Sequence, residues 1–336
     1  TLMRSSAASD VYKRQYLYRR NKTGICIDRV FGNDGIVEVP EMLEGLLVTE
    51  LGAYVFSDHI DRKDLERCKL SGNFCTDNGQ RVTDENGMPE ISGNIVKELI
   101  LPEHLRKIGR YAFYNCFSLR KISFGGELRD IGAGALTGCH RIERISVKTD
   151  EDGESSLRDV LTELPETLRV DMDRNGEQGR FWFPEFFEEG VENTPARILE
   201  NHVHGSGIRY RNSFLHKKLN ILEYDKLFPY AEAWEEEEIV LKLALDRILY
   251  PMDLTETVEK KYIDYLHEHG EHAVGVLGKN KEYEAMHRIL DKITPDREET
   301  EKMLECAQKF GDSRWVSILM DRLQSHGRKK RKAFEL

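Results

Sequence analysis

The sharpest chemical signal in the sequence is the segment Asp171–Glu177, in which acidic and amide side chains alternate. Oxygen ligands stand at its first, third and fifth positions and Gly176 stands at the sixth, as in the first half of a calcium-binding loop. The twelfth position of such a loop should hold a bidentate glutamate, but here it is Trp182. Since Asn-Gly is also a strong hairpin signal, we expect a polar turn between two strands rather than a calcium site.

Histidines cluster at His267, His269 and His272, near the end of a predicted helix. On a helix, positions 269 and 272 share a face while position 267 points elsewhere. A metal site would need a further ligand, which the sequence does not identify. We therefore expect a solvated helix terminus. We interpret His202 and His204, which alternate along a glycine-rich stretch, in the same way.

Two further groups carry weaker signals. A metal ion bound by His59, Cys68 and Cys75 could hold the loop between them in place. Their spacing, however, matches no established zinc-binding pattern. The basic run Arg328–Lys332 could contact nucleic acid or an acidic membrane surface, although a solvated tail is the default for such a run. No glycine-rich phosphate loop, nucleophile elbow or kinase signature is present. We therefore predict no catalytic residue, no cofactor and no metal ligand.

Composition restricts the partners. The chain has 336 residues, of which 39% are hydrophobic and 33% charged, with a net charge of −10. This acidic balance argues against nucleic acid as the main partner, and no apolar run approaches the roughly 20 residues that span a bilayer. Scattered cysteines in a chain of this size favour a reducing compartment, so we expect a cytoplasmic protein. The cysteines are Cys26, Cys68, Cys75, Cys116, Cys139 and Cys306.

An internal repeat in the middle of the chain determines how these side chains are positioned. Three segments share one pattern: apolar, two polar, apolar, Gly, and then small residues before a large apolar residue. They are Val48–Phe56, Leu105–Phe113 and Leu128–Leu136. Strand-like segments begin at residues 96, 119 and 142, a period of 23. That period falls within the range of roughly 20–29 residues for leucine-rich repeats.

The repeat predicts both a core and a candidate binding face. Apolar residues at strand positions one, four and six should point inward, so that stacked copies build one continuous core. We expect Gly52, Gly109 and Gly132 to permit a tight turn. Positions three and five should face solvent on a concave side, where mixed charge suits a protein partner better than a small-molecule pocket. These positions are Glu98, Ile100, Lys121, Ser123, Arg144 and Ser146.

The repeat resembles a known family. Ile108–Cys116 is a near-complete match, and Ile131–Cys139 a close match, to the I-G-x-x-A-F-x-x-C pattern of BspA-like bacterial leucine-rich repeats. The resemblance covers roughly residues 16–147, and the first copy has His59 where the cysteine should stand. It implies a curved solenoid used for protein contacts, and it implies no enzyme activity. We expect the two repeat cysteines to be buried small residues and not a redox pair.

The segments before and between the repeats have their own patterns. Tyr16–Tyr18, Ile25–Phe31 and Ile36–Val39 are predicted strands that cap the open end of the stack. An insertion over about 59–94 is rich in charge, Gly and Asn, and should emerge as loops on one face, often the binding face. Ser5–Gln15 looks like the in-frame translation of a transposon-type sequencing adapter, so we set residues 1–15 aside as a non-native leader.

From about Asn212 the apolar period changes from 2 to 3.6, which indicates helices. Their short connections predict antiparallel neighbours, and hence an array of helical hairpins. We expect Gly270, Gly278 and Gly311 at helix ends and Pro295 in a helix first turn. The expected helices lie near 235–250, 255–269, 271–278, 280–292, 296–310 and 312–325.

The predicted fold is mixed α/β: a leucine-rich-repeat β-solenoid followed by an all-α helical-hairpin array. Between them, aromatic residues in Phe181–Phe187 and the segment Val191–Leu199 predict a junction core, with an exposed aromatic binding patch as the alternative. The expected domains are a leader (1–15), the repeats with their insertion (16–170), an aromatic-rich junction (171–211), the helical array (212–326) and a basic tail (327–336).

These observations favour a non-catalytic protein–protein interaction scaffold that uses its repeat surfaces. We expect another protein as the partner, no small-molecule substrate and no transmembrane segment. One alternative is a secreted or surface adhesin of the BspA-like type. Another is an enzyme or metal-dependent module within residues 171–211, which would need carboxylates or histidines converging in a deep pocket.

Overall fold

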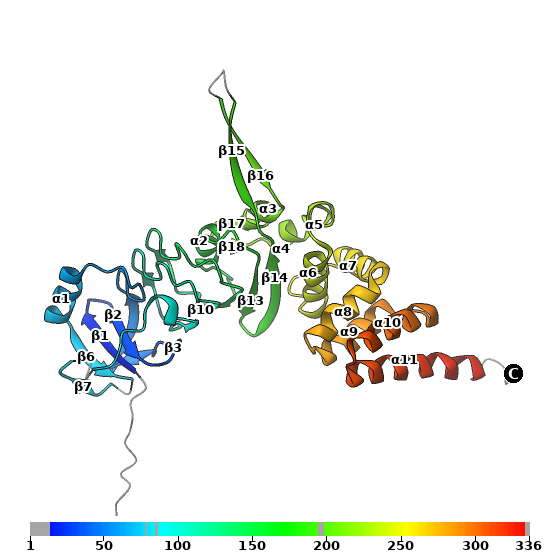
Figure 1. Cartoon of the computed structure of the whole chain (residues 1–336), viewed down its shortest axis with the longest axis horizontal. Coiled ribbons are helices and arrows are strands. Elements are labelled where there is room, and N and C mark those ends of the chain that lie inside the picture. Colours follow the sequence, from blue (N-terminus) through cyan, green and yellow to red (C-terminus); the bar gives the residue numbers. More distant parts are fainter. Residues whose placement is uncertain (1–13, 78, 85–86, 194–197, 333–336) are drawn as a thin grey trace, which may run out of the picture. The chain divides into compact units, whose positions relative to one another are not determined.

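The computed structural model describes residues 14–77, 79–84, 87–193 and 198–332, so residues 1–13 of the expected leader 1–15 lie outside the described residues. The chain forms two compact units. The repeat unit holds the described residues up to Leu168, with Asp173–Asn175 and Phe214–Leu219. The helical unit holds Arg169–Met172, Gly176–Ser213 and the described residues from Asn220 onward. The repeat unit holds the parallel strands, and the helical unit holds most of the helices together with a long antiparallel hairpin (Figure 1).

Parallel strands at the repeat spacing form a ladder in the repeat unit. Neighbouring strands pair in register, so that Leu99 lies opposite Ile122, and Ile122 opposite Ile145. All three side chains are buried, as the predicted inward positions require. The ladder strands are β3 (Ile36–Glu38), β8 (Glu98–Ile100), β10 (Lys121–Gly125) and β12 (Arg144–Thr149).

A second sheet contains the strands that precede each repeat glycine. Its parallel part joins β2, β5, β9 and β11, and its antiparallel part adds β1, β6 and β7 beyond β2. The strands are β1 (Arg14–Arg20), β2 (Ile25–Gly32), β4 (Met42–Leu43), β5 (Leu46–Leu51), β6 (Asn73–Thr76), β7 (Arg81–Val82), β9 (Lys107–Ile108) and β11 (Asp130–Ile131). The first of these begins at Arg14, inside the segment that we set aside as a leader.

The repeat glycines serve close stacking and not the tight turn that we expected. Gly52, Gly109 and Gly132 all lack a positive φ. A Cβ on Gly109 would lie 2.5 Å from backbone atoms of Gly52 and Ala53. A Cβ on Gly132 would lie 2.3 Å from the backbone nitrogen of Arg110. Glycine is therefore required because the backbones of successive repeats approach too closely for any side chain.

Left-handed backbone occurs elsewhere in each repeat, again at the repeat period. Tyr111 and Gly134 have φ of 52° and 65°, and Asn115 and Gly138 have φ of 59° and 86°. Tyr54 has φ of 58° at the matching position of the first copy. These are the residues at which the chain turns, and tyrosine occupies two positions where glycine would be easier.

Phenylalanine and cysteine side chains link one repeat to the next. The rings of Phe56 and Phe113 stack with centroids 5.8 Å apart. The Cys116 thiol donates to the carbonyl of Phe56 at 3.3 Å, and the Cys139 thiol donates to the carbonyl of Phe113 at 3.1 Å. Burial raises the pKa of Cys139 to about 12, and all six cysteines are free. The prediction that the two repeat cysteines are buried small residues is confirmed.

The segment Ile36–Val39 is part of the repeat ladder and not of the cap. Its strand pairs with β8 at an offset of 62 residues, whereas β5 pairs with β9 at an offset of 57. The chain from β3 to β5 is thus five residues longer than the chain from β8 to β9, and this longer connection, which contains β4, interrupts the repeat spacing of an additional repeat. The expectation for Tyr16–Tyr18 and Ile25–Phe31 agrees with β1 and β2.

The insertion at 59–94 is built into the fold, so the expectation that it emerges as loops is wrong. It contains α1 (Arg62–Ser71), β6, β7 and the short helix η1 (Gly93–Ile95). Strand β6 pairs with β1, and Phe74 packs against Leu17 and Phe31. The buried Arg29 guanidinium donates to Glu90 at 2.8 Å. Through these contacts the insertion extends the sheet formed by β1 and β2, and it does not form separate surface loops.

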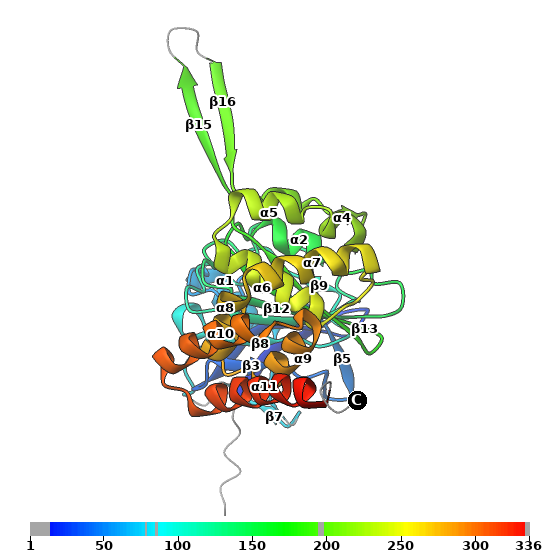
Figure 2. The same cartoon turned by 90° about the vertical axis from the view of Figure 1, so that its right-hand side faces the viewer.

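The helical unit follows the expected helices closely. Helix α6 packs against α7 and α8, α8 packs against α10, and α10 and α11 lie side by side in both views (Figures 1 and 2). The helices are α3 (Gly207–Arg211), α4 (Ile221–Asp225), α5 (Phe228–Trp234), α6 (Glu237–Leu249), α7 (Glu256–Glu268), α8 (Gly270–Lys279), α9 (Tyr283–Ile293), α10 (Arg297–Phe310) and α11 (Ser313–Lys332). No helix among the described residues is long and apolar enough to cross a membrane.

The three glycines expected at helix ends lie there, whereas Pro295 does not lie in a first turn. Gly311 ends α10 in the left-handed conformation. Gly270 begins α8, and Gly278 is the last residue but one of that helix. A Cβ on Gly278 would lie 2.3 Å from the Trp315 ring, so that glycine makes room for the indole. Pro295 precedes the cap of α10, whose capping box is formed by Asp296 and Glu299.

Aromatic residues of the predicted junction contribute to the core of the helical unit. The Tyr224 ring contacts the rings of Phe181, Phe183 and Tyr210 with centroids 4.8–5.7 Å apart. Phe187 begins the hairpin of β15 (Phe187–Asn193) and β16 (Ile198–His204), and its side chain is 58% exposed. The aromatic run therefore divides between a buried part and an exposed end.

Two short elements complete the chain. Helix α2 (Leu157–Thr162) buries Leu157, Val160 and Leu161 within the repeat unit. The hairpin of β17 (Phe214–Leu215) and β18 (Lys218–Leu219) lies in the segment where we expected the helical array to begin, yet it belongs to the repeat unit.

Candidate functional site

The candidate protein-binding face is the outer row of the β8–β10–β12 ladder. In-register pairing places Glu98 beside Lys121, and Lys121 beside Arg144. It likewise places Ile100, Ser123 and Ser146 in one line. All of these side chains are half-buried or exposed while the residues between them are buried. The structure therefore brings together the six residues that the sequence analysis singled out.

The ladder adds two residues that sequence reasoning missed. Ile36 pairs with Glu98, and Glu38 pairs with Ile100, because β3 continues the row by one strand. Ile36 is 49% exposed and Glu38 is also exposed. The alternation of Ile36, Val37, Glu38 and Val39 was the available signal, but the five-residue offset separated it from the repeat pattern.

Charge on this outer row is mixed. The Lys121 ammonium lies 3.2 Å from the Glu98 carboxylate, and both side chains are substantially exposed. Two exposed aliphatic side chains, Ile36 and Ile100, stand next to these charges. Apolar groups bordered by charged and hydroxyl groups match the composition of protein–protein interfaces.

A second surface, which the sequence analysis did not predict, is an aromatic cleft in the repeat unit. Its volume is about 480 Å³, and its lining includes Tyr54, His59, Tyr111 and Tyr114. The rings of Tyr54 and Tyr111 stack at 5.4 Å, and the rings of Tyr111 and Tyr114 meet edge-on at 5.6 Å. The tyrosines at the left-handed positions thus line one continuous aromatic surface.

The calcium-like segment forms the expected polar turn. Strands β13 (Leu168–Arg174) and β14 (Glu177–Phe183) are sheet neighbours joined by Asn175 and Gly176, whose φ values are 50° and 91°. Two successive left-handed residues define a type I′ hairpin turn. The Asp171 carboxylate lies 2.9 Å from Arg169 and 3.4 Å from Arg180. This carboxylate is therefore part of an ion-pair cluster and not of a loop of oxygen ligands.

Other candidate groups are not brought together. His59 pairs with Asp58, and among the described residues neither His59, Cys68 nor Cys75 belongs to a group of three ligand atoms within 4.8 Å. His204 stacks on Phe187. The backbone of α11 continues through Lys332, beyond the expected end at 325. The side chains of His202 and of the basic run Arg328–Lys332 lie outside the described residues.

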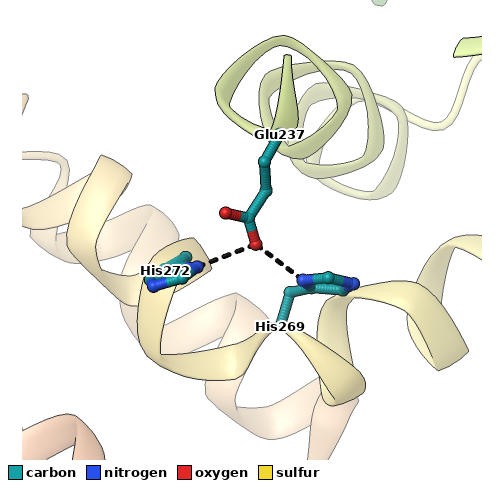
Figure 3. A group of neighbouring side chains, drawn as sticks. All are labelled: Glu237, His269 and His272. Atoms are coloured by element: carbon teal, nitrogen blue, oxygen red, sulfur yellow. Dashed lines mark hydrogen bonds and ion pairs between the residues drawn. The ribbon is translucent and has the colours of Figure 1, made fainter. Parts of the chain in front are cut away.

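One histidine pair, in contrast, gains a third residue. His269 lies between α7 and α8, His272 lies in the first turn of α8, and both face Glu237, the first residue of α6 (Figure 3). The His269 and His272 Nδ1 atoms lie 2.6 Å and 2.7 Å from the same Glu237 oxygen. His267 instead faces Glu299 at 3.6 Å, so 269 and 272 do share a face apart from 267.

Electrostatics at this cluster follow from its hydrogen bonds. Hydrogen bonds from His272 and then from His269 lower the pKa of Glu237. Glu237 was missed because it lies 32 and 35 residues before the histidines, with no local pattern to connect them. Only the packing of α6 against α8 brings the three side chains together.

Three features define a leucine-rich-repeat protein. They are the in-register parallel strands, the stacked glycines Gly52, Gly109 and Gly132, and the contacts between phenylalanine and cysteine residues of successive repeats. The repeats are of the BspA type: a family model described as BspA type leucine rich repeat region (6 copies) matches residues 92–156. Residues 92–156 are thus BspA-type leucine-rich repeats, and a helical region follows them toward the C-terminus.

Two further comparisons add little. No curated protein matches the chain. The chain is similar to a leucine rich cell surface protein from Faecalibacterium prausnitzii, known from a crystal structure, with 15% identity and a TM-score of 0.24. That match covers 47% of this chain and 41% of the other, so this chain spans less than half of that protein. The TM-score is too low to define a shared fold.

Proposed function

We propose that the protein is a non-catalytic protein-interaction scaffold. In this proposal the repeats close into a curved solenoid. The solvent-facing side chains of the ladder lie on its concave side, and the partner binds there. The observation that carries the proposal is the in-register ladder, which displays one continuous row of half-buried and exposed side chains across four strands. The row comprises Ile36, Glu38, Glu98, Ile100, Lys121, Ser123, Arg144 and Ser146.

The chemistry of the row supports a protein as the partner. It combines carboxylates, basic groups and hydroxyls with two exposed isoleucines, and each group is held by a strand whose alternate residues are buried. Side chains fixed on a rigid sheet lose little entropy on binding, which favours recognition of an extended protein surface. Opposite charges along one row also select the partner's orientation.

The test is affinity capture from bacterial extracts, with bound proteins identified by mass spectrometry. We expect the double variant Lys121→Glu/Arg144→Glu to lose most of the partner that the wild-type chain captures, because two basic contacts become repulsive. Both changes lie on the outer side of the ladder, so circular dichroism and thermal unfolding should stay close to wild type. Undiminished capture by a folded double variant would exclude this face.

A matched control uses the other surface of the repeat unit. Tyr111→Gly removes a ring from the aromatic cleft but keeps the left-handed backbone, since the next repeat has Gly134 at the same position. Our proposal predicts that Tyr111→Gly captures the partner as well as the wild-type chain does. Loss of capture in this variant alone would move the binding site from the ladder to the cleft.

A surface adhesin is a second proposal within the same class, and it is supported by the BspA-type repeats. It differs from the cytoplasmic scaffold in where the protein meets its partner, not in the face that it uses. Antibody labelling of intact bacterial cells tests it directly. Labelling of intact cells supports the adhesin, whereas labelling only after permeabilisation supports the cytoplasmic scaffold.

A further inference from the structure

The Glu237–His269–His272 cluster lies in the helical unit and has no part in the proposed binding face. Among the described residues it is the group in which three potential metal ligands lie within 4.8 Å of one another. The three side chains come from separate places in the sequence and point toward one shared oxygen atom (Figure 3). Two imidazoles and one carboxylate are a donor set that divalent zinc, nickel, copper and cobalt ions accept.

The distances are close to those of a metal site. In a tetrahedral zinc site, metal–ligand bonds of about 2.0–2.1 Å place neighbouring ligand atoms about 3.3 Å apart. Here the two nitrogens lie 2.6 Å and 2.7 Å from the Glu237 oxygen. Opening the cluster by about 0.6 Å would therefore admit an ion. Side-chain rotation suffices for this movement, because 42% of the Glu237 side chain and 63% of the His272 side chain are exposed.

The surroundings orient one ligand and leave room beside the cluster. The Tyr265 ring stacks on His269 with centroids 4.3 Å apart, which holds that imidazole facing Glu237. A cleft of about 480 Å³ runs past His269 and His272 and is also lined by Glu271, Glu299 and Lys302. Water can reach the open side of the cluster through this cleft. A site with three protein ligands keeps positions for such exchangeable ligands.

We propose that Glu237, His269 and His272 bind a divalent transition-metal ion of the zinc class, with the remaining positions taken by water from the cleft. The ion would join the start of α6 to the connection between α7 and α8. Metal binding would therefore stabilise the helical unit, since an ion that binds only the folded state shifts the unfolding equilibrium.

The experiment titrates the full chain, freed of any affinity tag and chelator, with ZnCl₂ by calorimetry and with CoCl₂ by visible absorption. We expect one ion per chain, a cobalt spectrum without a thiolate charge-transfer band, and a higher unfolding temperature with zinc. His269→Ala and His272→Ala should each weaken binding at least about tenfold, since loss of even an outer contact to a metal ligand costs that much.

Glu237→Gln separates a metal site from a set of hydrogen bonds. The amide keeps an oxygen facing both histidines but is a poorer ligand than a carboxylate, so we expect weaker metal binding with an unfolding temperature close to wild type in EDTA. His267→Ala is the matched control, because it lines the same cleft but faces Glu299, and it should bind metal like the wild-type chain.

Cys306 needs its own control, because it lines a smaller cleft of about 220 Å³ together with Glu237 and His272. We expect Cys306→Ser to bind metal unchanged. No binding of either ion by the wild-type chain would overturn the proposal. Binding that survives both histidine changes, or that is lost in Cys306→Ser, would also overturn it, because the ligands would then be other residues.

Discussion

In the repeat unit the same contact recurs from one repeat to the next. Cys139 contacts Phe113 as Cys116 contacts Phe56, and the left-handed positions Tyr111 and Asn115 recur 23 residues later at Gly134 and Gly138. In the helical unit the contacts that we expect to contribute most to stability occur only once each. Asp225 and Arg247 form a fully buried ion pair, with distances of 2.8 Å and 2.9 Å between their atoms.

This difference concerns the kind of interaction as well as its number. Repeated contacts in the first unit are mostly apolar stacking and backbone approach, and each copy adds a similar contribution. The buried pair in the second unit costs desolvation energy and is favourable only while both partners and their hydrogen bonds are in place. The Tyr262 hydroxyl donates to Asp225 at 2.8 Å and completes the arrangement. We expect the two units to respond differently to single substitutions.

The largest effect should follow from Asp225→Ala in the helical unit. The substitution leaves the Arg247 guanidinium buried without its partner, which costs about 3–5 kcal/mol. All three tryptophans, Trp182, Trp234 and Trp315, belong to the helical unit, so urea unfolding followed by tryptophan fluorescence reports on it directly.

A double variant, Asp225→Leu/Arg247→Met, serves as the control. Removing both charges together should cost less than removing Asp225 alone, because no unpaired ion remains buried. If Asp225→Ala lowers the free energy of unfolding by less than about 1 kcal/mol, the buried pair is not the decisive contact of this unit.

The next effect should follow from Gly132→Ala in the repeat unit. The new methyl group would overlap backbone atoms of Gly109 and Arg110, and backbone cannot move aside as a flexible side chain can. We expect a loss of about 1–3 kcal/mol, the usual range for overpacking. Hydrogen exchange measured by mass spectrometry should show faster exchange in peptides of the repeat unit and none of that change in the helices.

Ala133→Ser is the matched control for this substitution. Ala133 is exposed and adjacent in sequence, so its exchange rates should equal those of the wild-type chain. Equal exchange in Gly132→Ala and Ala133→Ser would contradict the account of the glycine column as a site of close backbone approach.

Repetition explains how much of the repeat unit was predictable. The period of 23 was sufficient to predict the buried and exposed positions of β8, β10 and β12 and the burial of Cys116 and Cys139. It was insufficient where the period is broken. Five extra residues between β3 and β5 separate β3 from the repeat period, so β3 was not recognised as part of a repeat. The insertion joins the sheet, where Phe74 packs on Leu17, and no periodicity indicates that contact.

In the helical unit the elements were predictable and their contacts were not. Apolar spacing at 3.6 residues indicated α6 to α10 and the start of α11 within about three residues, but not the end of α11 at Lys332. Gly278 lies at the end of α8 as expected, but its contact with the Trp315 ring could not be predicted from the sequence. Glu237 could not be linked to His269 and His272 from sequence, because only the packing of α6 against α8 makes them neighbours.

A smaller effect should appear at Glu44, a single contact within the repeat unit. Hydrogen bonds led by the one from Arg81 lower the pKa of Glu44 from 4.5 to about 2, and Arg20 adds another. A folded pKa below the unfolded one means that the stabilisation is complete above about pH 4.5 and is lost as pH falls towards 2.

Glu44→Gln should therefore lower the stability of the repeat unit by about 1 kcal/mol at pH 7, a modest value because both arginines are largely exposed to solvent. The difference from wild type should shrink as the pH is lowered from 5 to 2 in urea unfolding followed by circular dichroism. A difference that is constant across this range would show that the ion pairs to Glu44 are not the cause.

The smallest effect should have the opposite sign. Gly275 lies within α8, has no positive φ, and a Cβ placed on it meets no atom within 4 Å beyond its own helix. Gly275→Ala should therefore raise the free energy of unfolding of the helical unit by about 0.5–1 kcal/mol, because alanine restricts the unfolded chain and favours the helix. Gly278→Ala, three residues later on the same helix, should instead lower it and shift the Trp315 emission to the red as the indole is displaced. Urea unfolding followed by tryptophan fluorescence measures both variants. Equal effects from the two substitutions would contradict the view that single contacts, rather than helix propensity, decide where this unit tolerates change.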